Sequence, residues 1–336
     1  MSDRRTVLKL GIAAAAGLLL KRNAFASDPI RLIVGFAQGG PTSTIAKLIQ
    51  EPLGRAMGMA VAIDYVTGEG GKRAALEAIR AAPGSRTLLL HWPLILYKWD
   101  FELACNQPSR LPRHWQLTMC QWDEDGPILL GSGLKPVAKV TRGMSAALVV
   151  REDSALKDRA GLVAQAGRLP LKVAAAEGLV TGMDAFKKRT GADFNARLTD
   201  SQPAALDLVL ARQADVGLAF TSHVAAHNEG AAANDKLRVL ATSGAERAPE
   251  FASVPTLAEL VGNRKAAFTY SALVFSSAGA DTAFTSKATA ALQSIAQDPA
   301  LLEQAGKLRI PLQVDGPQTA LETIRRDRRV TKDVYG

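Results

Sequence analysis

A strand, a glycine turn and a helix between Pro29 and Gln50 constrain the fold of this chain most strongly. Residues 30–36 are mostly apolar and predict a buried strand, residues 37–41 predict a turn, and a helix is expected to start at residues 42–44. Hydroxyl side chains at a helix start can cap free backbone N–H groups. Those groups and the positive end of the helix dipole also attract anions, and glycine lets a ligand approach the backbone closely. The unit therefore predicts an anion-binding turn.

The same order of elements repeats along the first third of the chain. Residues 61–66 predict a second strand, residues 67–71 a second glycine turn, residues 73–82 a helix and residues 87–90 a third strand. Alternation of strands and helices favours parallel strands with right-handed crossovers. Ligands of such sheets lie at the carboxyl ends of the strands, where both glycine turns are expected.

A second strand, glycine turn and helix unit follows about 140 residues later, with its turn at residues 177–182. Further strands are expected at 146–150, 171–176, 216–220, 237–242 and 273–275. Residues 151–157 are expected to form a turn and helix start, with the helix continuing to about 166, and further helices are expected at 183–189, 206–213, from 254, 283–297 and 318–329. The whole chain is therefore predicted to be α/β.

Residues 1–26 are typical of a twin-arginine export signal. Arg4 and Arg5 precede an apolar run from Leu10 to Leu20, and Ala24-Phe25-Ala26 offers a cleavage site. The alternative is a short membrane anchor, but the run has 11 residues, whereas a spanning helix needs about 20. The mature chain is expected to begin at Ser27 in the periplasm. Because exported proteins meet little ATP or NAD, a small carboxylate is the expected anion.

Length and charge limit the function further. About 310 mature residues usually form two domains. The leader accounts for +4 of the formal net charge of +9, which leaves about +5 and suits anionic ligands. The basic residues are scattered, so nucleic-acid binding is not expected. The run from Arg325 to Arg329 is interpreted as a solvated helix face.

The cysteines and histidines carry little sign of a metal or cofactor site. Cys105 and Cys120 could form a disulfide in an oxidising compartment, or remain two separate thiols. His223 and His227 have helical i, i+4 spacing but lack the acid found between the ligands of a zinc protease helix. We expect neither a metal nor a cofactor.

Several blocks together resemble one family. These are Pro29–Leu48, Gly68–Gly71, Leu148–Lys157 and, most specifically, residues 237–243 with 246–247 and 254–259. In this order they are similar to the periplasmic solute-binding proteins of tripartite tricarboxylate transporters, also called the Bug family. The resemblance implies a two-lobed, type II-like Venus-flytrap fold with a ligand cleft between the lobes, formed by 27–145 with 256–336 and by 146–255.

The resemblance also implies a monomeric binding protein, without catalysis, that delivers a small organic carboxylate to membrane transporter subunits. Backbone amides of two loops, one per lobe, would hold the ligand: Phe36–Thr44 and, by a looser match, Glu177–Gly182. A further loop matches at Thr199–Ser201. The candidate ligand-binding residues are Phe36, Gln38, Gly39, Gly40, Thr42, Ser43, Thr44, Gly70, Trp92, Gly178, Thr181, Gly182, Thr199 and Ser201.

Three departures from the family pattern bear on the ligand. Pro41 has no N–H to donate. Ser43 stands where the family normally has an aspartate, which removes a partner for a ligand amine and favours an anion without an amino group. Leu179 and Val180 make the second loop more apolar, which favours an aromatic or branched acid.

The segment 91–134 is longer than the family's, and it contains all four tryptophans and both cysteines. It is interpreted either as an aromatic lid or wall over the cleft, starting at Trp92, or as a packed excursion stabilised by buried tryptophans.

Two other functions stay open. The protein could present its ligand to a sensor or act without a transporter. It could also be an exported enzyme, although no nucleophile elbow or dinucleotide fingerprint is present, and the acidic run Asp123–Asp125 is more typical of an exposed turn.

Overall fold

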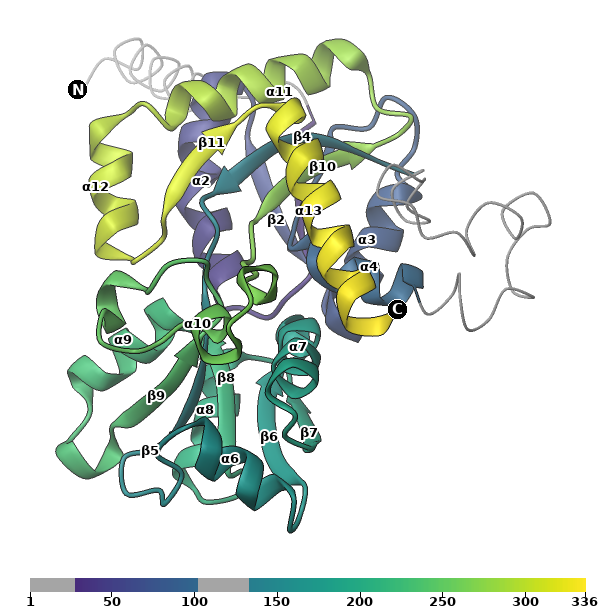
Figure 1. The fold of residues 1–336 in the computed structure, drawn as a ribbon. Coiled ribbons are helices and arrows are strands. Elements are labelled where there is room, and N and C mark those ends of the chain that lie inside the picture. The colour runs from purple at the N-terminus through teal and green to yellow at the C-terminus, as the bar shows by residue number, and fades with distance from the viewer. Residues whose placement is uncertain (1–27, 102–132) are drawn as a thin grey trace, which may run out of the picture.

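Two α/β lobes, each built on its own sheet, make up the part of the chain that the computed structural model describes, residues 28–101 and 133–336 (Figure 1). The expected two-lobed α/β fold is confirmed. The export signal, the Cys105–Cys120 pair and residues 102–132 of the Trp-rich segment lie outside the described residues.

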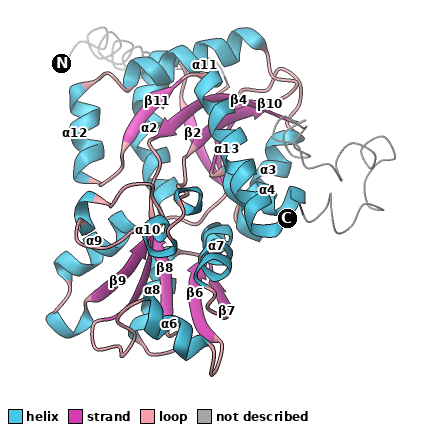
Figure 2. Cartoon of the chain, in the orientation of Figure 1, coloured by secondary structure: helices cyan, strands magenta, loops and turns pink. Residues whose placement is uncertain are grey.

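The first lobe contains a six-stranded sheet in the order β11-β4-β10-β3-β1-β2. The predicted parallel pairing of β1 with β2 and β3 is confirmed, whereas β10 runs antiparallel to β3 and β4. Its strands are β1 Ile30–Val34, β2 Val61–Tyr65, β3 Thr87–His91, β4 Leu134–Thr141, β10 Leu273–Ser277 and β11 Leu312–Asp315. Helices cover both faces, and they are α2 Pro41–Met57, η1 Glu69–Gly71, α3 Lys72–Ile79, α4 Pro93–Phe101, α11 Thr282–Ile295, α12 Pro299–Lys307 and α13 Pro317–Tyr335 (Figure 2).

The second lobe contains a five-stranded sheet in the order β7-β6-β8-β5-β9, with β6 parallel to β7 and β8. Its strands are β5 Ala146–Arg151, β6 Leu171–Ala176, β7 Phe194–Thr199, β8 Val216–Phe220 and β9 Leu237–Thr242. Its helices are α6 Arg159–Ala166, η4 Glu177–Leu179, α7 Val180–Thr190, α8 Gln202–Leu210, α9 Thr221–Gly230, η5 Ala233–Asp235 and η6 Pro249–Phe251. Helices α10 Leu257–Val261 and η7 Arg264–Ala266 lie in the segment that leads from β9 back to β10.

Two crossing segments join the lobes. One links β4 to β5, and the other returns from β9 to β10. They touch at Met144 and Tyr270, whose backbones form an antiparallel bridge with N–O distances of 2.7 and 2.9 Å. Both residues are buried. A pair of crossings tied at one point permits a hinge motion between two rigid bodies.

Several helix boundaries differ from the sequence expectations. Helix α2 starts at Pro41, and α6 starts at Arg159 rather than within residues 151–157, because the Asp158 side chain caps it by accepting from the Gly161 N–H. Helix α8 spans Gln202–Leu210 rather than 206–213. The elements β4, β7, β11, α4, α9 and α12 were not predicted.

The expectation of a solvated face at Arg325–Arg329 is wrong for two residues. Asp327 and Arg328 are buried, and the Arg326 guanidinium lies 2.7 Å from Asp327 Oδ1. Burial raises the pKa of the Asp327 carboxyl, and Arg326 opposes this rise. Helix α13 packs against α4, α7 and β4, so one face of its arginine-rich segment is buried while Arg325 and Arg329 stay exposed. Among the described residues, no helix combines the length and apolar character needed to cross a membrane.

Candidate functional site

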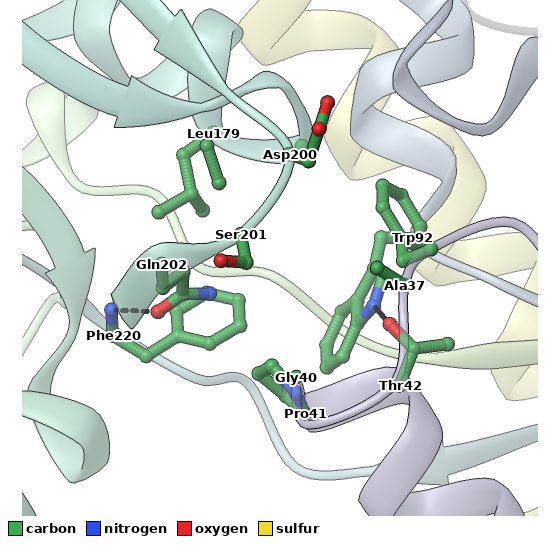
Figure 3. Close-up of a pocket in the computed structure, with 13 residues that line it drawn as sticks. Ala37, Gly40, Pro41, Thr42, Trp92, Leu179, Asp200, Ser201, Gln202 and Phe220 are labelled. Atoms are coloured by element: carbon green, nitrogen blue, oxygen red, sulfur yellow. Dashed lines mark hydrogen bonds between the residues drawn. The ribbon is translucent and has the colours of Figure 1, made fainter. Parts of the chain in front are cut away.

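A cavity of about 40 Å³ lies between the two lobes (Figure 3). One water molecule needs about 10–15 Å³ measured in this way, so the lobes enclose only a small space. The cavity is formed by the carboxyl ends of β1 and β3 in one lobe and of β6, β7 and β8 in the other, as expected for α/β sheets. The lining residues are Phe36, Ala37, Gly40, Pro41, Thr42, Trp92, Ala176, Gly178, Leu179, Asp200, Ser201, Gln202 and Phe220.

The start of helix α2 provides backbone donors on the side of the first lobe. Gly40 caps the helix in an extended conformation, and its carbonyl accepts from Thr44 N at 3.0 Å. Among the described residues, no acceptor lies opposite the N–H groups of Thr42 and Ser43. Free amides in the first turn of a long helix favour an anion through hydrogen bonds and the helix dipole.

The expected capping by hydroxyl side chains at this helix is wrong. Because α2 starts at Pro41, the three hydroxyl residues lie inside its first turn and have other partners. Thr42 Oγ1 accepts from Trp92 Nε1 at 2.6 Å, Ser43 Oγ lies 3.0 Å from the Tyr65 hydroxyl, and Thr44 Oγ1 donates to the Gly40 carbonyl at 3.1 Å. Of these side chains, only that of Thr42 belongs to a residue lining the cavity.

Trp92 forms part of the cavity wall, at the junction between β3 and α4. Its indole ring is buried, is held by Thr42 and lies 5.3 Å from the Phe220 ring of the other lobe. Two aromatic rings, one from each lobe, therefore meet beside the cavity. Of the residues that follow Trp92 in the segment 91–134, the structure describes helix α4, which ends at Phe101, and residues 133–134.

Two loops of the second lobe complete the cavity. Gly178 and Leu179 follow β6, and Asp200, Ser201 and Gln202 follow β7. Ser201 caps α8 by accepting from Ala204 N at 3.3 Å. The N–H groups of Gly178 and Gln202 have no acceptor among the described residues. Donors therefore reach the cavity from both lobes.

Other candidate residues lie around the cavity rather than in its lining. Gln38 and Gly39 are exposed on the turn before α2. Thr181 is buried and its hydroxyl donates to the Leu94 carbonyl at 3.3 Å. A Cβ atom on Gly182 would lie 2.3 Å from the Tyr270 hydroxyl, so this glycine permits close packing. The Thr199 hydroxyl donates to the Ser201 carbonyl at 2.8 Å and supports the loop.

Gly70 belongs to a contact between the lobes. Its N–H donates to Glu177 Oε2 at 2.6 Å, and its φ of 62° is in the left-handed region that glycine adopts readily. A carboxylate of the second lobe thus occupies the backbone donor that was expected to face the ligand.

Charge around the cavity is sparse. Asp200 is the one ionisable side chain among the lining residues. His91 lies behind Phe36, with 5.2 Å between the ring centroids, and its Nδ1 donates to the Trp92 carbonyl at 3.1 Å. Burial lowers the pKa of His91 to about 4, so its imidazole is neutral at pH 7. Within residues 28–101 and 133–336, no group of three or more His, Cys, Asp or Glu side chains could hold a metal ion.

Six of the individually named candidate residues line the cavity, and of seven further lining residues, four lie within the predicted ligand loops and three, Ala176, Gln202 and Phe220, lie outside them. The six are Phe36, Gly40, Thr42, Trp92, Gly178 and Ser201, and the seven are Ala37, Pro41, Ala176, Leu179, Asp200, Gln202 and Phe220. Asp200 and Gln202 flank the predicted Ser201, and Phe220 ends a predicted strand. The rule that ligands lie at carboxyl strand ends was the signal that could have found them.

Comparison with known proteins gives consistent results. A family model described as the tripartite tricarboxylate transporter family receptor matches residues 130–327. A UPF0065 protein from the tcbD-tcbE intergenic region of Pseudomonas sp. (strain P51) is 28% identical over 270 residues, which cover 77% of this chain and 72% of that protein.

Solved structures share the fold. MatC from Rhodopseudomonas palustris with bound malate has a TM-score of 0.73 at 20% identity and covers 92% of this chain and 99% of its own. Rpa4515 from R. palustris with adipate has a TM-score of 0.71 at 19% identity and covers 92% of this chain and 96% of its own. Because the family model spans more than half of the sequence, the chain belongs to the tripartite tricarboxylate transporter receptor family, whose members are solute-binding proteins.

Proposed function

We propose that this protein captures a small organic carboxylate between its lobes and delivers it to the membrane subunits of a tripartite tricarboxylate-type transporter. It does so as a monomer in the periplasm, after removal of residues 1–26, without catalysis and without a cofactor. The lobes are assigned to 27–145 with 256–336 and to 146–255, because these boundaries fall within the segments that link β4 to β5 and β9 to β10.

One observation carries the proposal: the N-termini of α2 and α8, from opposite lobes, both open into the same cavity. The amides of Thr42, Ser43 and Gln202 lack acceptors among the described residues, so a carboxylate would complete their hydrogen bonding. Each hydrogen bond to a charged group contributes about 1.5–3 kcal/mol. A few such bonds, less the entropic cost of binding, correspond to roughly micromolar affinity.

The relatives support the same class of ligand, since MatC has bound malate and Rpa4515 has adipate. The candidate contacts in this chain are the cavity-lining Phe36, Gly40, Thr42, Trp92, Gly178 and Ser201. The apolar side chains of Phe36, Trp92, Leu179 and Phe220 favour a ligand with an aromatic or branched body.

A thermal-shift screen of residues 27–336 against mono-, di- and tricarboxylates, aromatic acids and amino acids tests this proposal. A ligand that binds only the native state raises the melting temperature in proportion to the logarithm of its concentration over Kd. We expect a concentration-dependent shift with an acid that lacks an amino group. Stabilisation by amino acids alone, or by no acid, would contradict the proposal.

A further inference from the structure

A groove of about 660 Å³ lies beside the crossing segments, at the boundary between the lobes. It is lined by Arg142–Ser145, by the start of α9, by the loop Gly244–Glu250, and by the end of α12 with the turn that follows it. Among the described residues, none lines both this groove and the small cavity between the lobes. Figure 1 shows α9 and α12, one from each lobe, on the same side of the molecule. Small-molecule sites have volumes of about 300–1,000 Å³, so the groove has room for a ligand of its own.

Four hydroxyl side chains of the groove have no hydrogen-bond partner among the described residues, and they belong to Ser145, Thr221, Ser222 and Thr269. Thr221 and Ser222 are only 6% and 8% exposed, yet neither oxygen is sealed off by protein from the groove. A hydroxyl can both donate and accept. These two side chains are therefore placed to donate to whatever occupies the groove.

The same two residues open helix α9, which has no side-chain cap at its start. The Thr221 N–H donates to the Ser145 carbonyl at 3.0 Å. The N–H groups of Ser222 and His223 follow it in the first turn, where a helix has no i−4 acceptor for them. Backbone amides at such an end attract an anion, together with the positive end of the helix dipole. The start of α9 therefore combines amide and hydroxyl donors suited to an oxyanion.

The groove also holds one arginine without a counter-ion. Arg247 pairs with Glu259, and Arg309 pairs with Glu229. By contrast, no described residue forms an ion pair or a hydrogen bond with the side chain of Arg142. A guanidinium stays charged in proteins and presents donors that match the oxygens of sulfate or phosphate. Arg142 thus offers the groove a positive charge that is not neutralised within the protein.

Two acidic side chains, Glu246 and Glu250, also line the groove, and both are exposed. Water and salt screen the repulsion between exposed charges and an anion. These acids therefore weaken anion binding without excluding it, and they disfavour a polyanion more strongly than a small anion.

Arg142 and α9 lie on opposite sides of the hinge. The backbone of Arg142 is tied to the first lobe, because its N–H donates to the Pro311 carbonyl at 2.9 Å. Helix α9 follows β8 of the second lobe, where Phe220 lines the small cavity and Thr221 lines the groove. An anion that contacts both Arg142 and α9 would cross-link the two sides of the hinge.

We infer that this groove is a second binding site of the protein, for a small oxyanion of the size of sulfate or phosphate. The start of α9 holds the anion through the Ser222 and His223 amides and the Thr221 and Ser222 hydroxyls, and Arg142 supplies the positive charge. The inference goes beyond the proposed function, because this site is separate from the cavity between the lobes and does not depend on which acid that cavity binds.

Calorimetry on the mature protein with sodium sulfate and sodium phosphate, at an ionic strength held constant with chloride, tests the site. Arg142→Gln, and Thr221→Val combined with Ser222→Ala, should each weaken binding of the anion about tenfold, because each removes charge-assisted hydrogen bonds. Arg168→Gln is the matched control and should keep the wild-type affinity, since Arg168 is an exposed arginine outside the groove. Melting temperatures in chloride alone check that the variants fold.

A crystal structure with the selenate or arsenate analogue of the tighter-binding anion locates it, because selenium and arsenic scatter X-rays anomalously. We expect an anomalous peak within hydrogen-bond distance of the Ser222 amide. Peaks only elsewhere, a wild type that binds neither anion, or groove variants with wild-type affinity would overturn the inference. An Arg168→Gln variant that loses as much affinity as Arg142→Gln would overturn it too. Each of these outcomes leaves carboxylate capture between the lobes intact.

Discussion

At the residue scale, polar side chains near the cavity mostly satisfy one another and leave the backbone to face the ligand. Thr42 accepts from Trp92, Ser43 contacts Tyr65, and Glu177 accepts from Gly70. A buried polar group without a partner is costly, so these contacts rigidify the loops that carry the free amides.

His91 makes stability dependent on pH. Burial lowers its pKa in the folded protein to about 4, whereas the unfolded value is about 6.5. The unfolded state therefore binds more protons between pH 6.5 and pH 4. The stability tied to the neutral ring is complete above pH 6.5 and is lost as the pH falls, by about 3 kcal/mol at pH 4.

Urea denaturation between pH 4 and pH 8 should show this slope, and His91→Gln should flatten it. The same change at His227, whose ring bonds the Asp235 carbonyl at the surface, controls for the loss of a histidine as such. A His91→Gln variant with the wild-type slope would mean that His91 does not carry the effect.

At the element scale, the buried strands were predictable and the helix starts were not. The strands Leu171–Ala176, Val216–Phe220 and Leu237–Thr242 match their expected bounds, because each is a mostly apolar, mostly buried run. Strand β7 has mostly exposed residues and β11 is short, so neither has a strong pattern. Helix α2 started earlier than expected because Gly40 and Pro41 form a cap without a hydroxyl.

The candidate site was likewise predictable only where a local sequence pattern marks it. The sequence placed the glycine turns at the correct edge of each sheet, since connectivity determines that edge. It could not show which hydroxyl faces the ligand, because Tyr65 and Trp92 are distant in sequence from the hydroxyls of Ser43 and Thr42 with which they pair. Likewise, Glu177 reaches Gly70 only through tertiary structure.

The capping box at the start of α10 allows the contribution of one helix cap to the stability of the protein to be tested. Thr256 Oγ1 accepts from Glu259 N at 3.1 Å, and Glu259 Oε2 accepts from Thr256 N at 2.7 Å. Thr256→Val keeps the side-chain volume and removes the acceptor, so it should destabilise the protein by about 1 kcal/mol. Thr256→Ser keeps the hydroxyl and serves as the control. Equal urea midpoints for wild type and Thr256→Val would contradict the role of the cap.

At the scale of the whole molecule, hydrogen bonds and an ion pair join the two lobes. Lys98 Nζ and the Tyr335 hydroxyl, both from the first lobe, lie 3.0 and 2.6 Å from Asp184 Oδ2 of α7. Lys188 Nζ donates to the Val334 carbonyl at 3.2 Å. With the Gly70–Glu177 bond, these contacts favour a closed arrangement and reduce the conformational cost that a ligand must offset.

Glu177→Gln should shift the ligand-free protein toward an open arrangement, because it weakens a charge-assisted hydrogen bond between the lobes. A loss of about 1 kcal/mol would change the ratio of closed to open molecules about fivefold. Small-angle scattering should then give a larger radius of gyration for the variant. Glu69→Gln is the matched control, since Glu69 pairs with Lys72 and Arg73 of its own lobe. Identical radii for wild type and Glu177→Gln would rule out this contact as a latch.

The central claim is that helix N-termini from both lobes hold a carboxylate in the cavity. A crystal structure of residues 27–336 with the acid that gives the largest thermal shift tests it most directly. The account predicts that the carboxylate oxygens lie within hydrogen-bond distance of the Thr42 and Ser43 amides, with Trp92 and Phe220 on either side of the ligand. An acid bound outside this cavity, or a carboxylate held away from the start of α2, would contradict it.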